Sequence, residues 1–241
     1  MDKKIQKWQS EYLNKEMEIR SFGHYRLTLL LIRNSGTNFD DCINLVDSLE
    51  HIIKIGKCKI FLIDNVDEES WGNKDIDPKQ RSRRQFEYNN YIEEEVVNYI
   101  YSECGGPVPL MTCGADNGAY HAANLFFRRP DIFLGTIAVS GFYDIKMLTD
   151  GFFDDNCYYN SPVHYLPNLN DNYWLSYLLS RKHIYLASGS GSGENPEKTQ
   201  ELTRILFDKG IHHHTEIWGT EWDKSPRTWI AMLKYFLENK L

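Results

Sequence analysis

One segment of the chain has the residue types of a catalytic turn. An apolar stretch ending at Cys113 is followed by Gly114-Ala115-Asp116-Asn117-Gly118 and then by a helical pattern. Small residues at positions 114, 115, 118 and 119 suit a sharp strand-to-helix turn, because the two backbones must pass close together there. Such a turn normally reads Gly-x-Ser-x-Gly and lifts a nucleophilic serine to the carboxyl edge of a sheet. Here the central residue is Asp116, so a carboxylate stands where chemistry is expected.

Short apolar strands and amphipathic helices alternate along the chain and must position this turn. We expect strands at 16–22, 25–33, 59–64, 108–113, 136–140, 184–187 and 215–218. We expect helices at 84–102, 117–128, 197–208 and 226–239, and one more that Asp40 and Asp41 open. This alternation predicts an α/β fold with a mostly parallel sheet covered on both faces.

Ligands of such sheets bind beyond the carboxyl ends of the strands. The loops of interest therefore begin at Asn34, Asp64, Gly114, Ser140, Ser188 and Trp218. The irregular segment 146–173 is expected to lie over this edge as a cap. Since no repeat, linker or charge block marks a boundary, residues 1–241 are expected to form a single domain.

Several segments resemble the esterase-D-like family of α/β-hydrolases. The strongest runs from Gly114 to Phe133, and a second reads Ile137-Ala138-Val139-Ser140-Gly141-Phe142-Tyr143-Asp144. Glu69-Ser70-Trp71, Asn160-Ser161-Pro162 and Tyr165-Leu166-Pro167-Asn168-Leu169 are similar to the family's compact bacterial members. The resemblance extends from about residue 5 to the C-terminus. It implies an α/β-hydrolase fold with about eight strands, helices on both faces and a short cap segment.

The family's chemistry uses a serine nucleophile, a histidine base and an acid. By resemblance, the serine position falls on Asp116 and the histidine position on Lys224, within Trp218–Pro226. Glu194, in the loop after the strand 184–187, is the candidate acid. Loss of the serine or the histidine alone removes about six orders of magnitude in turnover. We therefore expect a degenerate triad without ordinary serine esterase activity, and the paired change favours an evolved new role over an engineered knock-out.

Asp116 has two different interpretations. As a helix N-cap, it would accept bonds from the following turn and place its own charge in the oxyanion hole. The resemblance builds that hole from the amide of Asn117 and one from the segment 34–38, where Gly36 and Thr37 are the candidates. Alternatively, Asp116 is a nucleophile, or forms a proton-transfer or ion pair with Lys224.

Aromatic residues at the carboxyl-edge loops indicate what the cleft would bind. If Trp71, Trp218 and Trp222 line it, the preferred ligand is hydrophobic or aromatic. His121 matches a family position outside the triad and is expected to pack. In His212-His213-His214 only the first and third side chains can converge, too few to indicate a metal site. The glycine-rich loop 188–193 lacks the spacing of a phosphate-binding loop. Neither a metal nor a cofactor is implied.

The net charge and the composition limit the kinds of partner that the protein is expected to bind. The 241 residues carry a net charge of −7, which argues against nucleic-acid and anionic-membrane binding. No apolar run is long enough to span a membrane. The five scattered cysteines indicate reduced thiols and a cytoplasmic protein. A homodimer is left open.

These observations together predict an esterase-like fold whose cleft binds a small molecule or peptide. Whether the protein is an enzyme stays open, and any catalysis would be of another kind than serine esterase chemistry. Two alternatives remain at this point: a genuine hydrolase that uses Asp116, and a non-catalytic structural or interaction protein.

Overall fold

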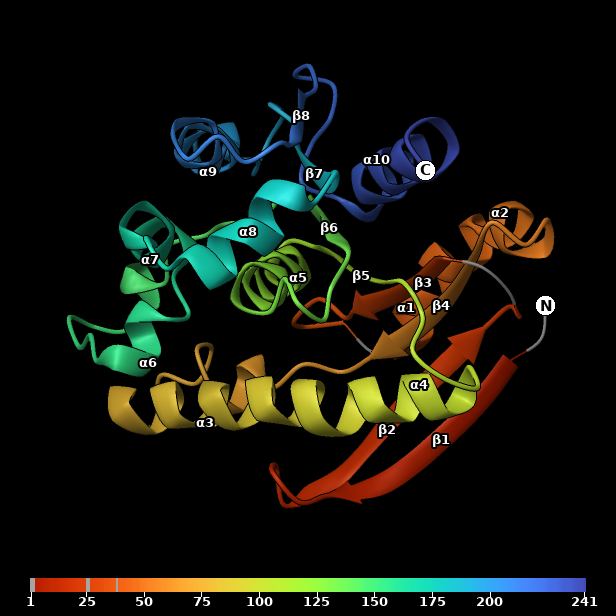
Figure 1. Ribbon diagram of the computed structural model, residues 1–241, viewed down its shortest axis with the longest axis horizontal. Coiled ribbons are helices and arrows are strands. Elements are labelled where there is room, and N and C mark those ends of the chain that lie inside the picture. The colour runs from red at the N-terminus through yellow and green to blue at the C-terminus, as the bar shows by residue number, and fades with distance from the viewer. Residues whose placement is uncertain (1–2, 25–26, 38) are drawn as a thin grey trace.

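An eight-stranded sheet carries the candidate site at its carboxyl edge (Figure 1). The computed structural model describes residues 3–24, 27–37 and 39–241. The strands are β1 (Lys3–Ser10), β2 (Lys15–Phe22), β3 (Leu27–Ile32), β4 (Cys58–Ile63), β5 (Leu110–Ala115), β6 (Gly135–Val139), β7 (His183–Ser188) and β8 (His214–Ile217). Their order is β1-β2-β4-β3-β5-β6-β7-β8. The pairs β1–β2 and β2–β4 are antiparallel and the other pairs are parallel, which confirms the predicted sheet.

Helices cover both faces of this sheet, so its central strands are apolar throughout. Successive residues of β3 face opposite sides: Leu30 packs in one core cluster and Leu29 in the other. The first side is covered by α3 (Pro78–Asn90), η2 (Tyr91–Val96), α4 (Val97–Glu103), α5 (Asn117–Arg128), α7 (Pro162–Asn168), α8 (Asn172–Ser180) and α9 (Pro196–Asp208). The second side is covered by α1 (Phe39–Ser48), α2 (Glu50–Lys54) and α10 (Pro226–Asn239).

Several elements differ from the sequence expectation. Strand β1 was not predicted, because its lysine-rich, largely exposed residues carry little of the apolar signal of a strand, as is common at sheet edges. The helix expected at 84–102 begins earlier, at Pro78, where Asp77 caps it by accepting from the amide of Lys79. It also changes to a π-helical turn over Tyr91–Val96.

The expected strand at 25–33 is β3, and residues 25 and 26 of that range lie outside the described residues. The segment 146–173 is less irregular than expected. It contains η3 (Lys146–Leu148), α6 (Asp155–Tyr158) and α7, and it runs into the start of α8. A further short helix, η1 (Asp67–Glu69), follows β4.

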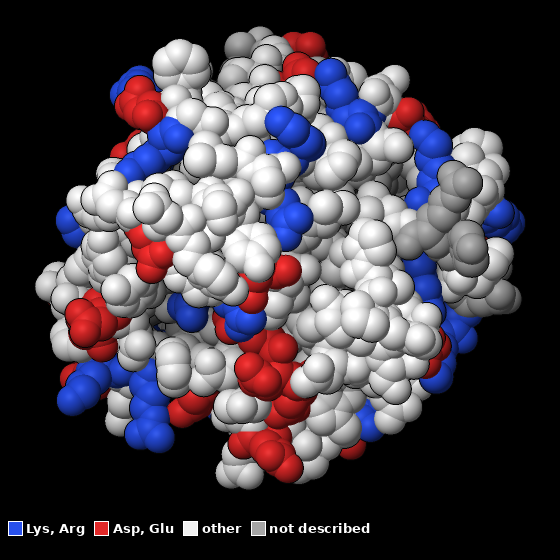
Figure 2. Space-filling view, in the orientation of Figure 1, with Lys and Arg blue, Asp and Glu red and all other residues white. Residues whose placement is uncertain are grey.

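Charged side chains of both signs lie on the surface (Figure 2). On the face in Figure 2, acidic and basic side chains are interspersed, and the drawn residues form no broad basic area there. Within the described part of the chain, no helix combines the length and apolar character that a membrane crossing needs.

Two glycines allow β5 and α5 to pass close together, as the sequence predicted. A Cβ at Gly114 would lie 2.3 Å from the carbonyl carbon and oxygen of Gly118, and a Cβ at Gly118 would lie 2.4 Å from the carbonyl oxygen of Ile32. These contacts are with backbone, which cannot rotate away. Strand, turn and helix are therefore locked in one geometry at the site.

We expect Gly118→Ala to lower the free energy of unfolding by about 3 kcal/mol, because the added methyl group must push α5 off β3. Gly56→Ala is the matched control: it also adds a methyl group, but in open space at φ 74°, and should cost only about 1 kcal/mol. Urea denaturation of both variants measures the difference. Equal losses would contradict the close-approach explanation.

Candidate functional site

Asp116 lies at the turn between β5 and α5 in a strained backbone conformation. Its φ of 52° and ψ of −118° are unusual for a residue other than glycine. Its amide donates to the carbonyl of Val139 on β6 (2.9 Å), and its own carbonyl accepts from the amides of Ala119 and Tyr120. Its side chain makes no capping hydrogen bond to α5. Asp116 therefore stands at the N-cap position of α5, but the side-chain capping bond of the N-cap interpretation is absent and the carboxylate points elsewhere.

The carboxylate of Asp116 forms an ion pair with Lys224. The distance between Lys224 Nζ and Asp116 Oδ1 is 2.6 Å, and the two side chains are 38% and 17% exposed. Asn34, just beyond the end of β3, donates from Nδ2 to the other carboxylate oxygen (3.4 Å). The structure thus brings together the nucleophile-equivalent and base-equivalent positions that the resemblance assigned.

Asn34 also accepts the hydrogen bond of the amide that was expected to form the oxyanion hole. The backbone N–H of Asn117 donates to Asn34 Oδ1 at 3.3 Å. The charge of Asp116 was expected to fill this position in the N-cap interpretation, and the structure places a neutral amide oxygen there instead. Of the other two candidates, Thr37 donates to the carbonyl of Asn34 (2.7 Å), and Gly36 is an exposed turn residue at φ 70°.

The glycine-rich loop after β7 explains how Lys224 reaches Asp116. A Cβ at Gly189 or Gly191 would lie 2.1 or 2.6 Å from the carbonyl oxygen of Trp222. The amide of Gly191 donates to that same oxygen (2.9 Å), and the amide of Lys224 donates to the carbonyl of Ser192 (2.9 Å). The glycines therefore serve the close approach of two loops, which gives the loop 188–193 a role other than a phosphate cradle.

Glu194 binds hydroxyl groups at the ends of two neighbouring strands. Its Oε1 accepts from Ser140 (2.6 Å) and its Oε2 from Ser188 (3.1 Å). Ser140 follows β6 at φ 55°, and Ser188 ends β7. Both oxygens of Glu194 are thereby engaged, and among the described residues it has no hydrogen bond or ion pair to Lys224.

Two hollows lie at this edge of the sheet, and the first of them contains the ion pair. A small polar one of about 170 Å³ is lined by Asp116, Ser140, Gly141, Phe142, Met147, Gly193, Glu194, Asn195, Lys198 and Lys224. A more apolar one of about 260 Å³ is lined by Leu31, Ile32, Asn34, Thr37, Cys42, Asn44, Leu45, Ala115, Pro226, Trp229 and Ile230. Of the expected cap, Met147 contributes to the polar hollow.

The three tryptophans expected in the cleft lie outside both linings. Trp71 is buried, and its indole N–H donates to the hydroxyl of Tyr120 (3.0 Å). Trp218 and Trp222 pack edge to face with ring centroids 4.7 Å apart, and the guanidinium of Arg227 lies over Trp222. The inference of an aromatic ligand from these rings therefore loses its basis.

A buried histidine–carboxylate pair supports the turn. His121 Nε2 donates to Asp67 Oδ1 at 2.8 Å, and these residues are 1% and 2% exposed. Asp67 Oδ2 accepts from the hydroxyl of Ser35 and from Asn117 Nδ2 (3.2 Å). One carboxylate thus joins α5 to the loop that carries Asn34. From the sequence, His121 was expected only to pack and Asp67 was not singled out, because the two residues lie 54 positions apart.

Burial and hydrogen bonding act in opposite directions on Asp67. Burial raises the pKa of its carboxyl group, but the charge of His121 and hydrogen bonds from His121, Ser35 and Asn117 outweigh it and hold the pKa below 3.8. A lowered folded-state pKa means that the unfolded chain binds the proton more readily. The stabilisation by this carboxylate is therefore complete above its unfolded pKa and is lost as the pH falls through the lower, folded value.

We expect Asp67→Asn to lower the free energy of unfolding at pH 7 by about 3 kcal/mol, because it removes a buried carboxylate that accepts hydrogen bonds from His121, Ser35 and Asn117. The difference from the unmodified protein should shrink as the pH falls below 3.8, the ordinary value. Urea denaturation across pH 7 to about 3 measures it. The exposed Asp75→Asn is the control and should change stability by no more than about 0.5 kcal/mol. A pH-independent difference would contradict the assignment of the charge to Asp67.

The histidine tract behaves as its spacing predicted. The rings of His212 and His214 lie 4.9 Å apart, while His213 Nδ1 donates to the carbonyl of Ile211. Over residues 3–24, 27–37 and 39–241, no three histidine, cysteine, aspartate or glutamate side chains are grouped to hold a metal ion.

Comparisons with known proteins identify the fold. No family model matches the chain, and no curated protein does. Solved structures do match: a ferulic acid esterase has a TM-score of 0.73 at 16% identity, covering 98% of this chain and 96% of its own. An S-formylglutathione hydrolase from Agrobacterium tumefaciens has 0.73 at 11%, covering 98% and 94%. FphF, a fluorophosphonate-binding serine hydrolase of Staphylococcus aureus, has 0.67 at 14%, covering 98% and 97%. The chain therefore has the α/β-hydrolase fold that the resemblance implied, and its structural neighbours include esterases.

Proposed function

Starting from an α/β-hydrolase fold with Asp116 at its central turn, we propose that this site binds a small molecule and does not hydrolyse esters as a serine esterase does. The observation that carries the proposal is the 2.6 Å contact between Lys224 Nζ and Asp116 Oδ1. In this proposal the two residues replace the serine and the histidine of the esterase-like ancestors. Whether any other catalysis uses the pair depends on the ligand.

The ion pair disfavours both steps of covalent hydrolysis. A carboxylate that is neutralised by an ammonium group is a weaker nucleophile, and a protonated lysine cannot activate water as a base. The amide of Asn117, which would stabilise an oxyanion, already donates to Asn34. Each of these contacts would have to break before Asp116 could act as the nucleophile of a genuine hydrolase.

The same contacts suit a ligand with a dipolar head group. Asp116 and Lys224 offer a negative and a positive charge side by side, so a zwitterion or an amide matches them better than a single charge does. The apolar hollow of about 260 Å³ is lined by Ala115, which precedes Asp116 in the chain, and by Asn34, which donates to the Asp116 carboxylate. It exceeds an engineered cavity of about 150 Å³ that holds benzene. We infer a small dipolar molecule with a short apolar group, of amino-acid or short-peptide character.

Turnover of p-nitrophenyl acetate tests the first half of the proposal. We expect background rates for the unmodified protein, for Asp116→Ala and for Lys224→Ala. Activity that disappears in both variants would establish a hydrolase that uses Asp116 and would overturn the proposal.

A rebuilt site provides the positive control for this assay. Asp116→Ser combined with Lys224→His should show weak ester hydrolysis. Adding Asn34→Ala frees the amide of Asn117 and should raise the rate about 100-fold, the usual contribution of one oxyanion donor. A folded triple variant without turnover would contradict the assignment of positions 116 and 224.

Thermal stabilisation by matched probes tests the second half. Norleucine carries both charges, whereas hexanoate and hexylamine carry one each on chains of similar length. At a hundred times its dissociation constant, norleucine should stabilise the protein by about 2.7 kcal/mol. The effect should be lost in Asp116→Ala and Lys224→Ala and retained in Lys182→Ala, which removes an exposed lysine.

Equal effects of the three probes would contradict recognition of a dipolar head group. If no probe changes the stability and no ester is hydrolysed, the non-catalytic structural or interaction protein becomes the better interpretation.

A further inference from the structure

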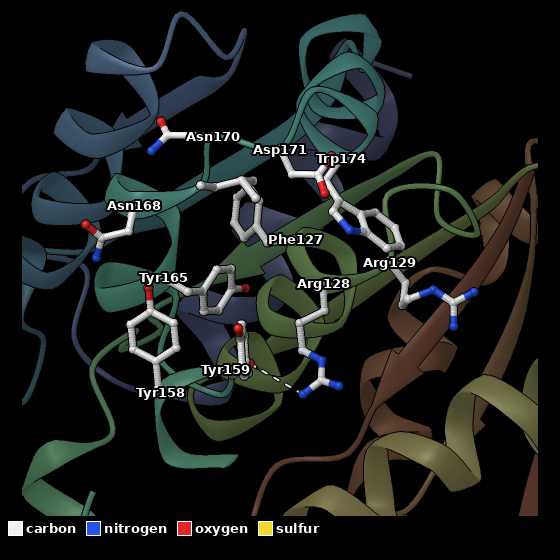
Figure 3. A pocket seen from close by; sticks show the side chains of 11 residues that line it. Phe127, Arg128, Arg129, Tyr158, Tyr159, Tyr165, Asn168, Asn170, Asp171 and Trp174 are labelled. Carbon is white, nitrogen blue, oxygen red and sulfur yellow. Dashed lines mark hydrogen bonds between the residues drawn. The ribbon is translucent and has the colours of Figure 1, made fainter. Parts of the chain in front are cut away.

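A third hollow lies at the opposite end of α5 from Asp116. It has a volume of about 530 Å³ and is lined by the end of α5 and by residues of α6, α7 and α8 (Figure 3). The 12 residues of α5 separate it from the ion pair by about 18 Å along the helix. Its volume is in the range of small-molecule sites, about 300–1,000 Å³. The proposal for the ion pair gives this hollow no role.

Aromatic rings form its base and walls. Phe127 and Tyr165 are 2% and 7% exposed and form the base. Tyr158, Tyr159 and Trp174 stand around them, as Figure 3 shows. The rings of Tyr158 and Tyr159 meet edge to face at 5.0 Å, and Tyr159 is 56% exposed. Rings held in this way offer a flat ligand several faces and edges to pack against.

Arg128 brings a cation to these rings with much of its hydrogen-bonding capacity unused. One terminal nitrogen donates to the carbonyl of Tyr159 at a long 3.4 Å. The other forms an ion pair with Glu93 Oε1 at 3.9 Å, a distance too long for a hydrogen bond. A guanidinium group has five N–H donors. The neighbouring Arg129 points away from Arg128 in Figure 3 and binds Glu93 at 2.7 Å and Asp131 at 2.8 Å. The nearby carboxylates are therefore held mainly by Arg129.

The one acidic side chain in the lining is also engaged. Asp171 accepts from the amide of Tyr173 at 2.8 Å and so caps the N-terminus of α8. The partial positive charge of that helix end offsets the carboxylate. An anion at Arg128 thus meets a cation with free donors. Of the two carboxylates nearby, Asp171 caps α8 and Glu93 is hydrogen-bonded to Arg129.

We propose that this hollow binds a small aromatic carboxylate, with its ring among the tyrosines and Trp174 and its carboxylate on Arg128. A planar guanidinium binds a planar carboxylate through two parallel hydrogen bonds, which favours this group over a single-point anion. The site is separate from the Asp116–Lys224 ion pair, and either proposal can fail without the other.

Calorimetric titration of the full chain with 2-naphthoate tests the proposal, with 2-naphthylmethanol as the uncharged probe of the same ring. We expect the naphthoate to bind more tightly than the alcohol. Arg128→Gln should weaken naphthoate binding at least tenfold, since a charge-assisted contact is lost, and should leave the alcohol unchanged. Trp174→Ala should weaken both probes, and Lys224→Ala should weaken neither.

Three results would overturn the proposal: equal naphthoate affinity of the unmodified protein and Arg128→Gln, loss of binding in Lys224→Ala, or no binding at millimolar concentration. Because Arg128 contacts the backbone of Tyr159, the unfolding temperature of its variant must be measured too. If Arg128→Gln does not fold, Trp174→Ala decides: unchanged binding of both probes would then overturn the proposal.

Discussion

The close passage of three backbones at the turn after β5 is the constraint on which the site depends. Gly114 lies against Gly118, and Gly118 lies against the carbonyl of Ile32 at the end of β3. These contacts exclude a wider turn between strand and helix. Asp116 is therefore held at a positive φ with its side chain at the edge of the sheet. They also fix the end of β3, and two residues later Asn34 reaches both Asp116 and the amide of Asn117.

A second close approach completes the site from the other side. Gly189 and Gly191 let the loop that carries Lys224 lie against the loop after β7. The resulting ion pair is partly exposed, so it adds little to stability. In the proposed function its importance is electrostatic: the two charges neutralise each other in the free protein, and each would bind the opposite charge of a dipolar ligand.

The surrounding polar groups hold this arrangement rigid. Glu194 ties the ends of β6 and β7 together through Ser140 and Ser188. Asp67 ties α5 to the loop after β3 through His121, Asn117 and Ser35. Buried carboxylates are costly unless every partner is in place. The same groups that position the ion pair are therefore among those whose loss the fold tolerates least.

The sequence by itself determined the fold class and the place of the site. Apolar strands in alternation with helices predicted the parallel sheet, and the small residues at 114 and 118 predicted the turn, because both signals are local and depend on a few neighbouring residues. The resemblance pointed to Asp116, Lys224 and Glu194 as one constellation. The loop starts Asn34, Ser140 and Ser188 were also recognised as lying at the functional edge.

Only the tertiary structure decided how these residues are paired. Asp116 forms an ion pair with Lys224 and makes no side-chain capping bond to α5. Glu194 accepts hydrogen bonds from two serines, and Asn34 accepts the hydrogen bond of the Asn117 amide. The loops near the edge carry Trp71, Trp218 and Trp222, but the ring of Trp71 contacts Tyr120 and the other two rings pack against each other. Hydrogen bonds and ion pairs between residues dozens of positions apart depend on side-chain direction and on loop-to-loop distance. No local pattern encodes these two quantities, and the packed chain fixes both.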